Sequence, residues 1–257
     1  MKRKIKFENI FVVLSIVFVF GCIIFYGNRL VKYYRVFNPK TESGEKVEVF
    51  SATVRKDNPV VTEGEGLYAQ NGDFVFKGED VNNYVLYAGK TWRIMQVYLN
   101  GQVKLVLDIP LAEVSYDNQK TTYEKSYIHS YIKDSNNLKL NYDDLEEVDI
   151  CLDELDDISK LTCENKMTDK VSILGLNDYI NSLSIETNKS YINNTKNIWL
   201  YNKNSEGLAW NIANGKLSKD ELSFEYSVKP VITLKGTAHC ETGKGTENDP
   251  YIVKVGK

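Results

Sequence analysis

The chain has little histidine and little cysteine: its 257 residues include two histidines and four cysteines. It contains no Cys-x-x-Cys pair, no Gly-x-Ser-x-Gly elbow, no His-Glu-x-x-His helix and no phosphate-binding glycine loop. The usual patterns of zinc sites, serine hydrolases and nucleotide-binding enzymes are therefore missing. Gly243–Thr246 is rich in glycine but lacks the spacing of a phosphate loop, so we interpret it as a turn. We predict no catalytic residue, no metal ligand and no cofactor.

The sequence does not decide whether the protein is an enzyme, although we favour a protein that is not one. His129 falls in a tyrosine-rich segment, and we interpret it as a surface or boundary residue rather than a base. His239 is the only histidine beside a cysteine. A pair of carboxylates can still perform acid–base chemistry, but 35 acidic residues give no means of choosing such a pair.

Charge is absent from Ile10 to Tyr26, where the sequence reads IFVVLSIVFVFGCIIFY. A helix of this length spans ~26 Å, close to the ~30 Å hydrocarbon core of a bilayer. We predict a transmembrane anchor over residues 10–27, preceded by a cytoplasmic tail over residues 1–9. Two alternatives stay open. Val19–Cys22 loosely fits a lipobox, which would place a lipid on Cys22, and a cleaved secretory signal is disfavoured because apolar residues continue after Cys22.

The charges that flank this stretch are nearly balanced, so they give only a weak preference for a cytoplasmic amino terminus. The rest of the chain is more informative. Removing the seven basic residues and one acid of residues 1–35 from the totals of 32 and 35 leaves 25 basic and 34 acidic residues, or about −9. An acidic body of this kind disfavours binding to nucleic acid or to anionic headgroups. We predict a single-pass protein of the cell membrane whose C-terminal domain is extracellular.

Residues 28–63 are predicted to form a stalk and a lead-in strand. Residues 38–46 are polar and include Pro39 and Gly44, which is typical of a flexible linker. The lead-in strand is inferred from a strand-like run of apolar residues at Val47, Val49, Ala52 and Val54.

The next part of the chain has the pattern of successive β-strands. Asn-Gly pairs predict tight hairpin turns, because both residues tolerate the positive φ of a type I′ turn. Such pairs occur at Asn71–Gly72, Asn100–Gly101 and Asn214–Gly215. Tyr226–Leu234 is predicted to be one strand with an edge or bulge at Pro230, and Asp249–Val253 a final strand.

Two segments are predicted to be helical. In Thr121–Lys133, Tyr123, Tyr127 and Tyr131 recur at every fourth position, which predicts one apolar stripe that packs on a sheet. A tyrosine stripe as a sugar-binding surface is the alternative. A second helix is predicted to begin at Asn177, after a strand over residues 171–174.

Nine acids lie between Asp143 and Asp157, but no register of oxygen ligands matches an EF-hand loop. We interpret this segment as a solvated helix face. A helix over residues 151–163 would separate Cys151 and Cys163 by ~18 Å, whereas a disulfide needs Cα atoms within ~7 Å. A continuous helix and a disulfide therefore exclude each other across this segment. We predict a disulfide between Cys151 and Cys163, with helix only before Cys151, and Cys240 as the unpaired thiol.

Several short landmarks in one order resemble a family of uncharacterised, singly anchored surface proteins of Gram-positive bacteria. Their ectodomain is similar to C-type-lectin-like folds related to formylglycine-generating enzymes. The landmarks are Gly66–Tyr68, Phe74–Glu79, Asn82–Val85, Trp92–Ile94, the cysteine pair, residues 171–174, Trp199, Trp210, Val228–Ile232 and Gly243–Tyr251.

The resemblance implies an α+β domain over residues 64–257, with a mixed, mainly antiparallel sheet, two helices and a long loop region. It also implies that the terminal strands come together. The Glu-Pro-Asn or Gln-Pro-Asp triplet of calcium-dependent lectins is absent, and the paired cysteines of the enzymes have no counterpart. The resemblance therefore implies a fold rather than a lectin or oxidase activity.

These observations predict a membrane-tethered extracellular binding or interaction module that contacts the membrane through its N-terminal helix and does not bind nucleic acid. Its ligand is predicted to be a glycan, a cell-wall polymer or a surface protein. Trp199 and Trp210 are the candidate ligand-binding residues. Two other functions stay open, an extracytoplasmic enzyme that acts on envelope material and a structural subunit of a membrane assembly.

Overall fold

A computed structural model describes residues 48–119, 121–160 and 163–256. The described chain forms one compact unit of mixed α and β structure, mostly antiparallel sheet, which confirms the predicted α+β class. The predicted cytoplasmic tail, the anchor and most of the stalk lie outside the described residues, as does Cys22. Among the residues that the structure describes, no helix has the length and apolar character needed to cross a bilayer.

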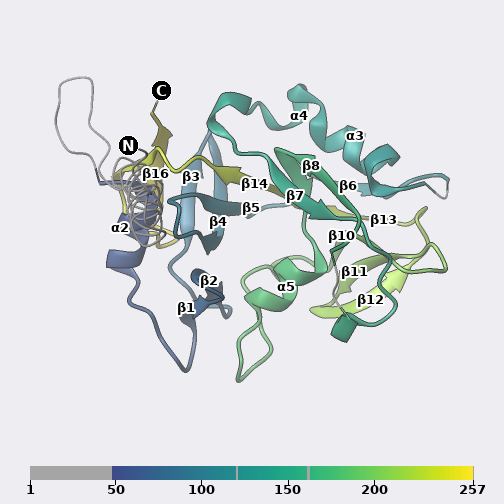
Figure 1. Cartoon of the computed structure of the whole chain (residues 1–257), viewed down its shortest axis with the longest axis horizontal. Helices are drawn as coiled ribbons and strands as arrows, with labels where there is room; N and C mark the ends of the chain where they lie inside the picture. The colour runs from purple at the N-terminus through teal and green to yellow at the C-terminus, as the bar shows by residue number, and fades with distance from the viewer. Residues whose placement is uncertain (1–47, 120, 161–162, 257) are drawn as a thin grey trace, which may run out of the picture. The chain divides into compact units, whose positions relative to one another are not determined.

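The larger sheet has nine strands (Figure 1). Its main path runs β15-β16-β3-β4-β5-β14-β9, and the β1–β2 hairpin joins it through β2 and β4. Only β16 and β3 pair in parallel in this sheet. The strands are β1 (Gly66–Gln70), β2 (Asp73–Lys77), β3 (Tyr84–Tyr87), β4 (Lys90–Val97), β5 (Val103–Leu107), β9 (Val171–Ile173), β14 (Pro230–Leu234), β15 (Ala238–Thr242) and β16 (Tyr251–Val255).

A second sheet has five strands in the order β12-β11-β10-β13-β6, and a separate hairpin pairs β7 with β8. In the five-stranded sheet, β10 and β13 are parallel and the other neighbours are antiparallel. The strands are β6 (Ala112–Ser115), β10 (Asn197–Lys203), β11 (Ala209–Ala213), β12 (Lys216–Asp220) and β13 (Glu225–Val228), with β7 (Val148–Cys151) and β8 (Lys166–Asp169) in the hairpin.

The predicted single strand over Tyr226–Leu234 is wrong, because the chain changes sheets within it. Its first part is β13 of the five-stranded sheet and its second part is β14 of the nine-stranded sheet. Lys229 lies between the two strands, and Pro230 is the first residue of β14, opposite Ile173. A proline lacks the N–H that a continuous ladder needs, so it is tolerated at the first position of a strand.

The described residues include four α-helices, where the sequence predicted two in the domain. In Figure 1, α3 and α4 lie at the top of the view and α5 at the bottom. The helices are α2 (Phe50–Asp57), α3 (Tyr127–Lys133), α4 (Ser135–Leu138) and α5 (Leu176–Ser182), with short 3₁₀ turns η1 (Tyr123–Lys125), η2 (Tyr142–Asp144) and η3 (Ile158–Lys160).

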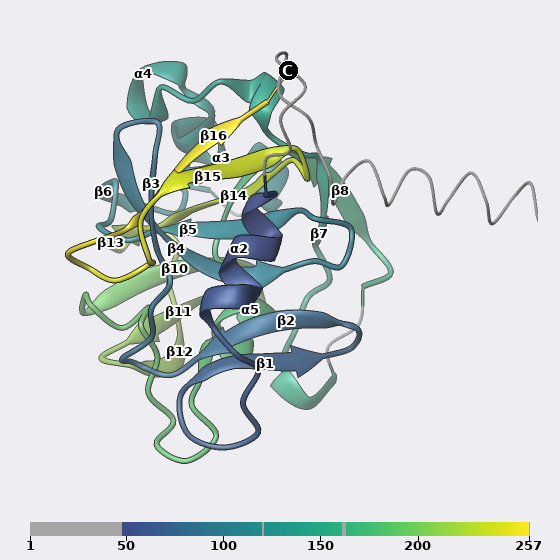
Figure 2. The ribbon, with the colours of Figure 1, turned by 90° about the vertical axis from the view of Figure 1, so that its left-hand side faces the viewer.

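The predicted lead-in strand is wrong, since its residues enter helix α2. Phe50 and Val54 are spaced by one helical turn and are both fully buried. The Phe50 ring meets Tyr251 of β16 edge-on, with ring centroids 5.5 Å apart, and the backbone of Val49 pairs with His239 of β15. Figure 2 shows α2 in front of the nine-stranded sheet. Burial of one helical face therefore decides the structure of this segment.

The predicted helix over Thr121–Lys133 is divided into η1 and α3. Ser126 between them is extended (φ −74°, ψ 157°), and its hydroxyl accepts a hydrogen bond from the His129 N–H as the cap of α3. The break separates the tyrosines of the predicted stripe: Tyr123 is 2% exposed and Tyr127 is 44% exposed. A single apolar stripe is therefore wrong, whereas the prediction that α5 begins near Asn177 is confirmed.

Two of the three predicted Asn-Gly turns have positive φ at both residues. These are Asn71–Gly72 (φ 51° and 87°), between β1 and β2, and Asn214–Gly215 (φ 48° and 76°), between β11 and β12. At Asn100–Gly101 only the glycine has positive φ, because the loop between β4 and β5 is longer. Ala88–Gly89 makes a further turn of this kind, which the Asn-Gly pattern does not detect.

Candidate ligand site beneath the disulfide loop

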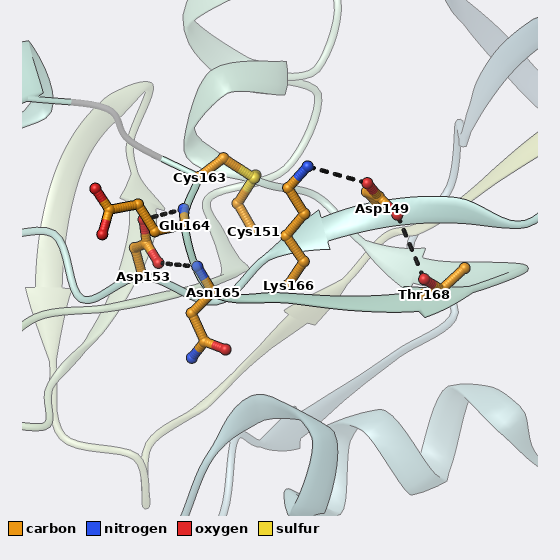
Figure 3. The surroundings of a disulfide bond; sticks show 8 residues. All are labelled: Asp149, Cys151, Asp153, Cys163, Glu164, Asn165, Lys166 and Thr168. Carbon is orange, nitrogen blue, oxygen red and sulfur yellow. Dashed lines mark hydrogen bonds and ion pairs between the residues drawn. A yellow bond between two sulfur atoms is a disulfide. The ribbon is translucent and has the colours of Figure 1, made fainter.

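A disulfide joins Cys151, at the end of β7, to Cys163, with Cα atoms 5.1 Å apart (Figure 3). The predicted pairing is confirmed in the structure. The helix predicted before Cys151 is wrong, because these residues form β7 and pair with β8. The apolar spacing of that segment has another cause: Leu145 and Leu155 are buried in the core from extended and loop positions. We call residues 151–163 the bridged loop.

Acidic side chains hold the base of the bridged loop through hydrogen bonds and an ion pair. The Asp153 carboxylate accepts hydrogen bonds from the backbone N–H groups of Glu164 (2.9 Å) and Asn165 (2.7 Å). Asp149 pairs with Lys166 at 3.1 Å and accepts a bond from Thr168 at 3.3 Å (Figure 3). Charged acceptors strengthen such bonds, so part of the acidic cluster stabilises the hairpin.

The middle of the bridged loop is fixed to the five-stranded sheet. The Leu155 N–H donates to the Lys203 carbonyl (2.8 Å), and the Trp210 indole N–H donates to the Leu155 carbonyl (2.7 Å). Asp156 accepts bonds from the backbone and hydroxyl of Ser205, at 3.1 and 2.9 Å. Lys219 lies over the Trp210 ring, 4.5 Å from its centroid. The loop is therefore held at both ends and in its middle.

The two tryptophans predicted to contact a ligand are core residues in the structure. Trp199 is fully buried and Trp210 is 7% exposed. The Trp199 indole donates to the Val114 carbonyl (3.0 Å), and its ring packs edge-on against Tyr116. Neither indole presents a face on which a ligand can stack, and Trp210 instead positions the bridged loop.

One cavity beside the bridged loop has a volume of about 430 Å³, and we call it the amide cavity. Its polar groups are of mixed type: amides, tyrosine hydroxyls, two carboxylates and one lysine. Among the described residues, the Tyr98 hydroxyl and the Asn177 amide have no hydrogen-bond partner. The lining residues are Gln96, Tyr98, Lys104, Asp149, Cys151, Leu155, Cys163, Asn177, Asp178, Tyr201 and Asn202.

Lys104 and Asp178 form a fixed ion pair in the wall of the amide cavity, with Nζ and Oδ1 2.5 Å apart. The other Asp178 oxygen accepts the Gly175 N–H at the start of α5 (3.1 Å). Burial acts against the Lys104 charge, but the Asp178 carboxylate outweighs it and raises the pKa of Lys104 above its ordinary value. Lys104 therefore keeps its charge, and the pair is a polar contact of fixed geometry.

A second cavity, of about 460 Å³, also borders the base of the bridged loop, and we call it the acidic cavity. Three carboxylates and one lysine give it a negative balance. Its lining residues are Thr122, Tyr123, Leu152, Asp153, Glu154, Glu164, Asn165, Tyr201 and Lys203.

Tyr201 of β10 lines both cavities. A Cβ added to Gly175 would lie 2.5 Å from the Tyr201 ring, so the glycine leaves room for this side chain. The ring of Tyr201 also lies beside that of Tyr123, with the two ring centroids 5.6 Å apart. Burial raises the pKa of Tyr201 to about 12, against the effect of a backbone hydrogen bond from Cys151. The hydroxyl therefore stays protonated and able to donate.

His129 is buried (6% exposed), so its predicted surface or boundary position is wrong. Its Nε2 lies 3.1 Å from Asp169 Oδ2, and its Nδ1 lies 2.9 Å from the Glu124 carbonyl. Lys133 also contacts Asp169, at 2.6 Å. Burial raises the pKa of Asp169, but hydrogen bonds from His129 and Lys133 outweigh it and hold this pKa well below its ordinary value. This cluster joins α3 to β8 and lines neither cavity.

The remaining predicted positions lie away from the two cavities. Cys240 is an unpaired thiol on β15, as predicted, and Gly243–Thr246 is a turn between β15 and β16. Within residues 48–119, 121–160 and 163–256, no group of three or more His, Cys, Asp or Glu side chains is arranged to hold a metal ion.

Sequence reasoning did not detect the residues that line the cavities. They come from separate elements, mainly β4, β5, β10, α5 and the bridged loop, and share no motif. The one available signal was the cysteine pair, which marks the loop that borders both cavities.

Comparisons of the chain with models of protein families, with curated proteins and with solved structures found no match. The resemblance to C-type-lectin-like surface proteins therefore stays a prediction, and the function has to be inferred from the site.

Proposed function

We propose that the chain is a membrane-tethered extracellular binding module and that it binds a glycan in the amide and acidic cavities. The observation that supports this proposal best is the arrangement around Tyr201. Two polar cavities of ligand size share this residue and border one disulfide-bridged loop. Recognition of a sugar requires many fixed donors and acceptors on a rigid frame, together with an aromatic surface.

The lining chemistry favours a polyhydroxylated ligand. Tyr98 and Asn177 offer polar groups that are not engaged by other described residues, while Lys104 and Asp178 are held in place by each other. A sugar hydroxyl both donates and accepts, so it can satisfy amides, carboxylates and hydroxyls at once. Tyrosine adds a rigid, amphipathic contact surface.

The charge of the acidic cavity restricts the ligand class. Asp153, Glu154 and Glu164 face one lysine there, and the chain beyond residue 35 carries about −9. Anionic polymers would be repelled. Neutral glycans, or glycans with free amino groups, fit this cavity better.

The location is inferred from two independent features. The uncharged stretch at residues 10–26 has the length of a membrane anchor, and disulfides persist in oxidising compartments. We also propose the finer fold assignment to the C-type-lectin-like class. It is supported by the long bridged loop and by the pairing of Val49 with β15, which brings the start of the domain to its last strands.

The experiment that tests the proposed function is a binding screen against neutral, amino and acidic glycans, including peptidoglycan fragments. Residues 48–257 form one compact unit and provide the probe. We expect a neutral or amino glycan to bind, and the variants Asn177→Ala and Tyr98→Phe each to weaken binding about tenfold, as for the loss of one good hydrogen bond. Tyr127→Phe, on an exposed residue outside the cavities, is the matched control. Absence of binding to every glycan would contradict the proposal.

The same screen separates the two other predicted functions. An enzyme that acts on envelope material would shorten or release the glycan during incubation, which mass spectrometry of the ligand detects. A structural subunit of a membrane assembly would bind no glycan and would instead copurify with fixed partners when the full chain is extracted in detergent.

A further inference from the structure

Lys229 is a buried lysine (1% exposed) at the point where the chain passes from β13 to β14. Its Nζ donates to the Asp108 backbone carbonyl at 2.6 Å and to Oδ1 of Asn194 at 2.5 Å. Lys104, another lysine whose amine is bonded within the domain, has a carboxylate partner in Asp178. The Lys229 amine instead faces an amide.

The surroundings of Lys229 disfavour its charged form. Burial lowers the pKa of Lys229 to about 7, and Arg93 acts in the same direction against the opposing effect of Asp108. A large fraction of the amine is therefore neutral near neutral pH and carries a free electron pair. Desolvation together with a neighbouring cation is a recognised way to make a lysine nucleophilic.

The Asn194 amide is held in position for attack. Its Nδ2 donates to the Asp108 backbone carbonyl (2.9 Å) and to the Asp108 carboxylate (3.2 Å). The Cγ carbon is one C=O bond, ~1.2 Å, from Oδ1, and so lies at most ~3.7 Å from Nζ. This is near the separation of reacting atoms in a near-attack conformer.

The Asp108 carboxylate is itself oriented by Arg93, whose guanidinium lies 3.5 Å away and is buried. Arg93 in turn donates to Asn83 Oδ1 (2.5 Å) and packs 3.7 Å from the centre of the Tyr84 ring. The Asn194 side chain thus contacts the Lys229 amine through Oδ1 and the Asp108 carboxylate through Nδ2.

We propose that Lys229 and Asn194 become joined by an isopeptide bond that the folded chain forms without another enzyme. The neutral Nζ attacks Cγ of Asn194, and the Nζ–Cγ bond forms. The attacking nitrogen gives up one proton, and the departing Nδ2, which lies 3.2 Å from the Asp108 carboxylate, takes one up. The Cγ–Nδ2 bond then breaks, ammonia leaves, and the carbonyl at Oδ1 is restored. One amine and one primary amide become one secondary amide and ammonia, with no oxidant or reductant.

The positions of the groups favour this direction of reaction. Lys229 is excluded from water, which disfavours protonation of its amine. Asn194 lies in an exposed loop, so ammonia can escape. Asp108 contacts the leaving nitrogen directly, as a proton-transfer group must. The bond would tie the loop before β10 to the crossover between the two sheets and would not depend on any ligand.

The test is a peptide map of the full chain, produced in a heterologous host and purified in detergent. Trypsin cleaves after Lys189, Lys196, Lys219 and Lys235, so the bond would join peptides 190–196 and 220–235 into one branched species. Its mass would be the sum of both peptides less one ammonia. Cyclisation at an Asn-Gly pair also releases ammonia, but it changes other peptides and joins none. Recovery of both peptides separately and unmodified would overturn the proposal.

Variants assign the roles of the residues. Asn194→Ala removes the electrophile and Lys229→Met removes the nucleophile with little change in volume, so the branched peptide should be absent in both. Asn193→Ala is the matched control and should retain it. Asp108→Asn should reduce the branched species at least tenfold; undiminished bond formation would overturn the assignment of Asp108. If Lys229→Met fails to fold, the map of the unaltered chain still decides whether the bond exists.

Discussion

Trp210 donates its indole N–H to the Leu155 carbonyl at 2.7 Å, and this contact ties the bridged loop to the five-stranded sheet. Leu155 is buried and lines the amide cavity, so the position of the loop determines the shape of that cavity. A largely buried aromatic residue thereby acts on the candidate site through the backbone of Leu155.

The variant Trp210→Phe should loosen the bridged loop. It removes one buried hydrogen bond, at a cost of about 1 kcal/mol in the free energy of unfolding, and leaves the Leu155 carbonyl without its donor. Hydrogen exchange of residues 152–156 should become faster. Trp199→Phe removes an equivalent bond to Val114 and is the control, since it should destabilise the fold without accelerating exchange in this loop. Equal exchange in the two variants would contradict the role given to Trp210.

The double variant Cys151→Ser/Cys163→Ser should lower the free energy of unfolding by about 3 kcal/mol, because the cross-link closes a short loop in the unfolded chain. Chemical denaturation measures this difference. Glycan affinity should fall as well, since both cysteines line the amide cavity. Cys240→Ser, at the unpaired thiol, should leave both quantities within error.

Gly175→Ala should displace Tyr201, because the added Cβ would stand 2.5 Å from its ring. We expect a loss of about 1–3 kcal/mol in unfolding free energy, as for overpacking of a core, and weaker glycan binding because Tyr201 lines both cavities. The matched variant Gly256→Ala adds a methyl group whose nearest neighbour, the Thr237 carbonyl oxygen, lies at an ordinary contact distance of 3.6 Å, and it should not change binding. Unchanged affinity in Gly175→Ala would argue against Tyr201 as a ligand contact.

The Asp169 cluster should make stability depend on pH in acid. The folded-state pKa of Asp169 lies below its ordinary value, so its ionised form stabilises the fold above the unfolded pKa of about 3.9. This stabilisation is lost as the pH falls further, through the folded-state pKa. Asp169→Asn should cost about 2 kcal/mol at pH 7, and the difference should shrink below about pH 4. Urea denaturation at a series of pH values measures it, and a difference that does not change with pH would refute the assignment.

Cys240 should react slowly with alkylating agents. Burial raises the pKa of its thiol to about 11, and Asp57 and Asp249 add to this effect. Since the thiolate is the reactive form, alkylation of residues 48–257 at pH 8 should be about a hundredfold slower than that of a free cysteine and should accelerate as the pH rises. A rate equal to that of a small thiol would contradict the raised pKa of this half-buried thiol.

The elements that the sequence predicted well are those decided by local chemistry. Asn71–Gly72 and Asn214–Gly215 favour one backbone geometry by themselves, and the cysteine pair permits few arrangements of its loop. The elements that it predicted poorly are decided by distant partners. Phe50 and Val54 form a helical face because Tyr251, near the other end of the chain, offers a surface for it. The apolar pattern of residues 50–54 alone is compatible with the period of a helix and with that of a strand.

The candidate site shows the same limit more strongly. Tyr98, Asn177 and Tyr201 are ordinary residues of a strand end, a helix start and a strand, and only the tertiary fold brings them to one cavity. Trp199 and Trp210 were predicted as ligand-binding residues because large aromatic residues often occur in binding sites. In this chain the indole N–H groups of both tryptophans donate internal hydrogen bonds, to the carbonyls of Val114 and Leu155.

The pairing of Val49 with His239 has a practical consequence for handling the protein. The chain enters the domain beside its last hairpin, and α2, β15 and β16 contribute no residue to either cavity. A fluorophore, surface tether or fusion partner attached beyond Gly256 would therefore sit on the same edge as the start of the domain. Under the proposed topology, immobilisation through that end reproduces the orientation at the membrane and leaves the bridged loop accessible to large, insoluble polymers.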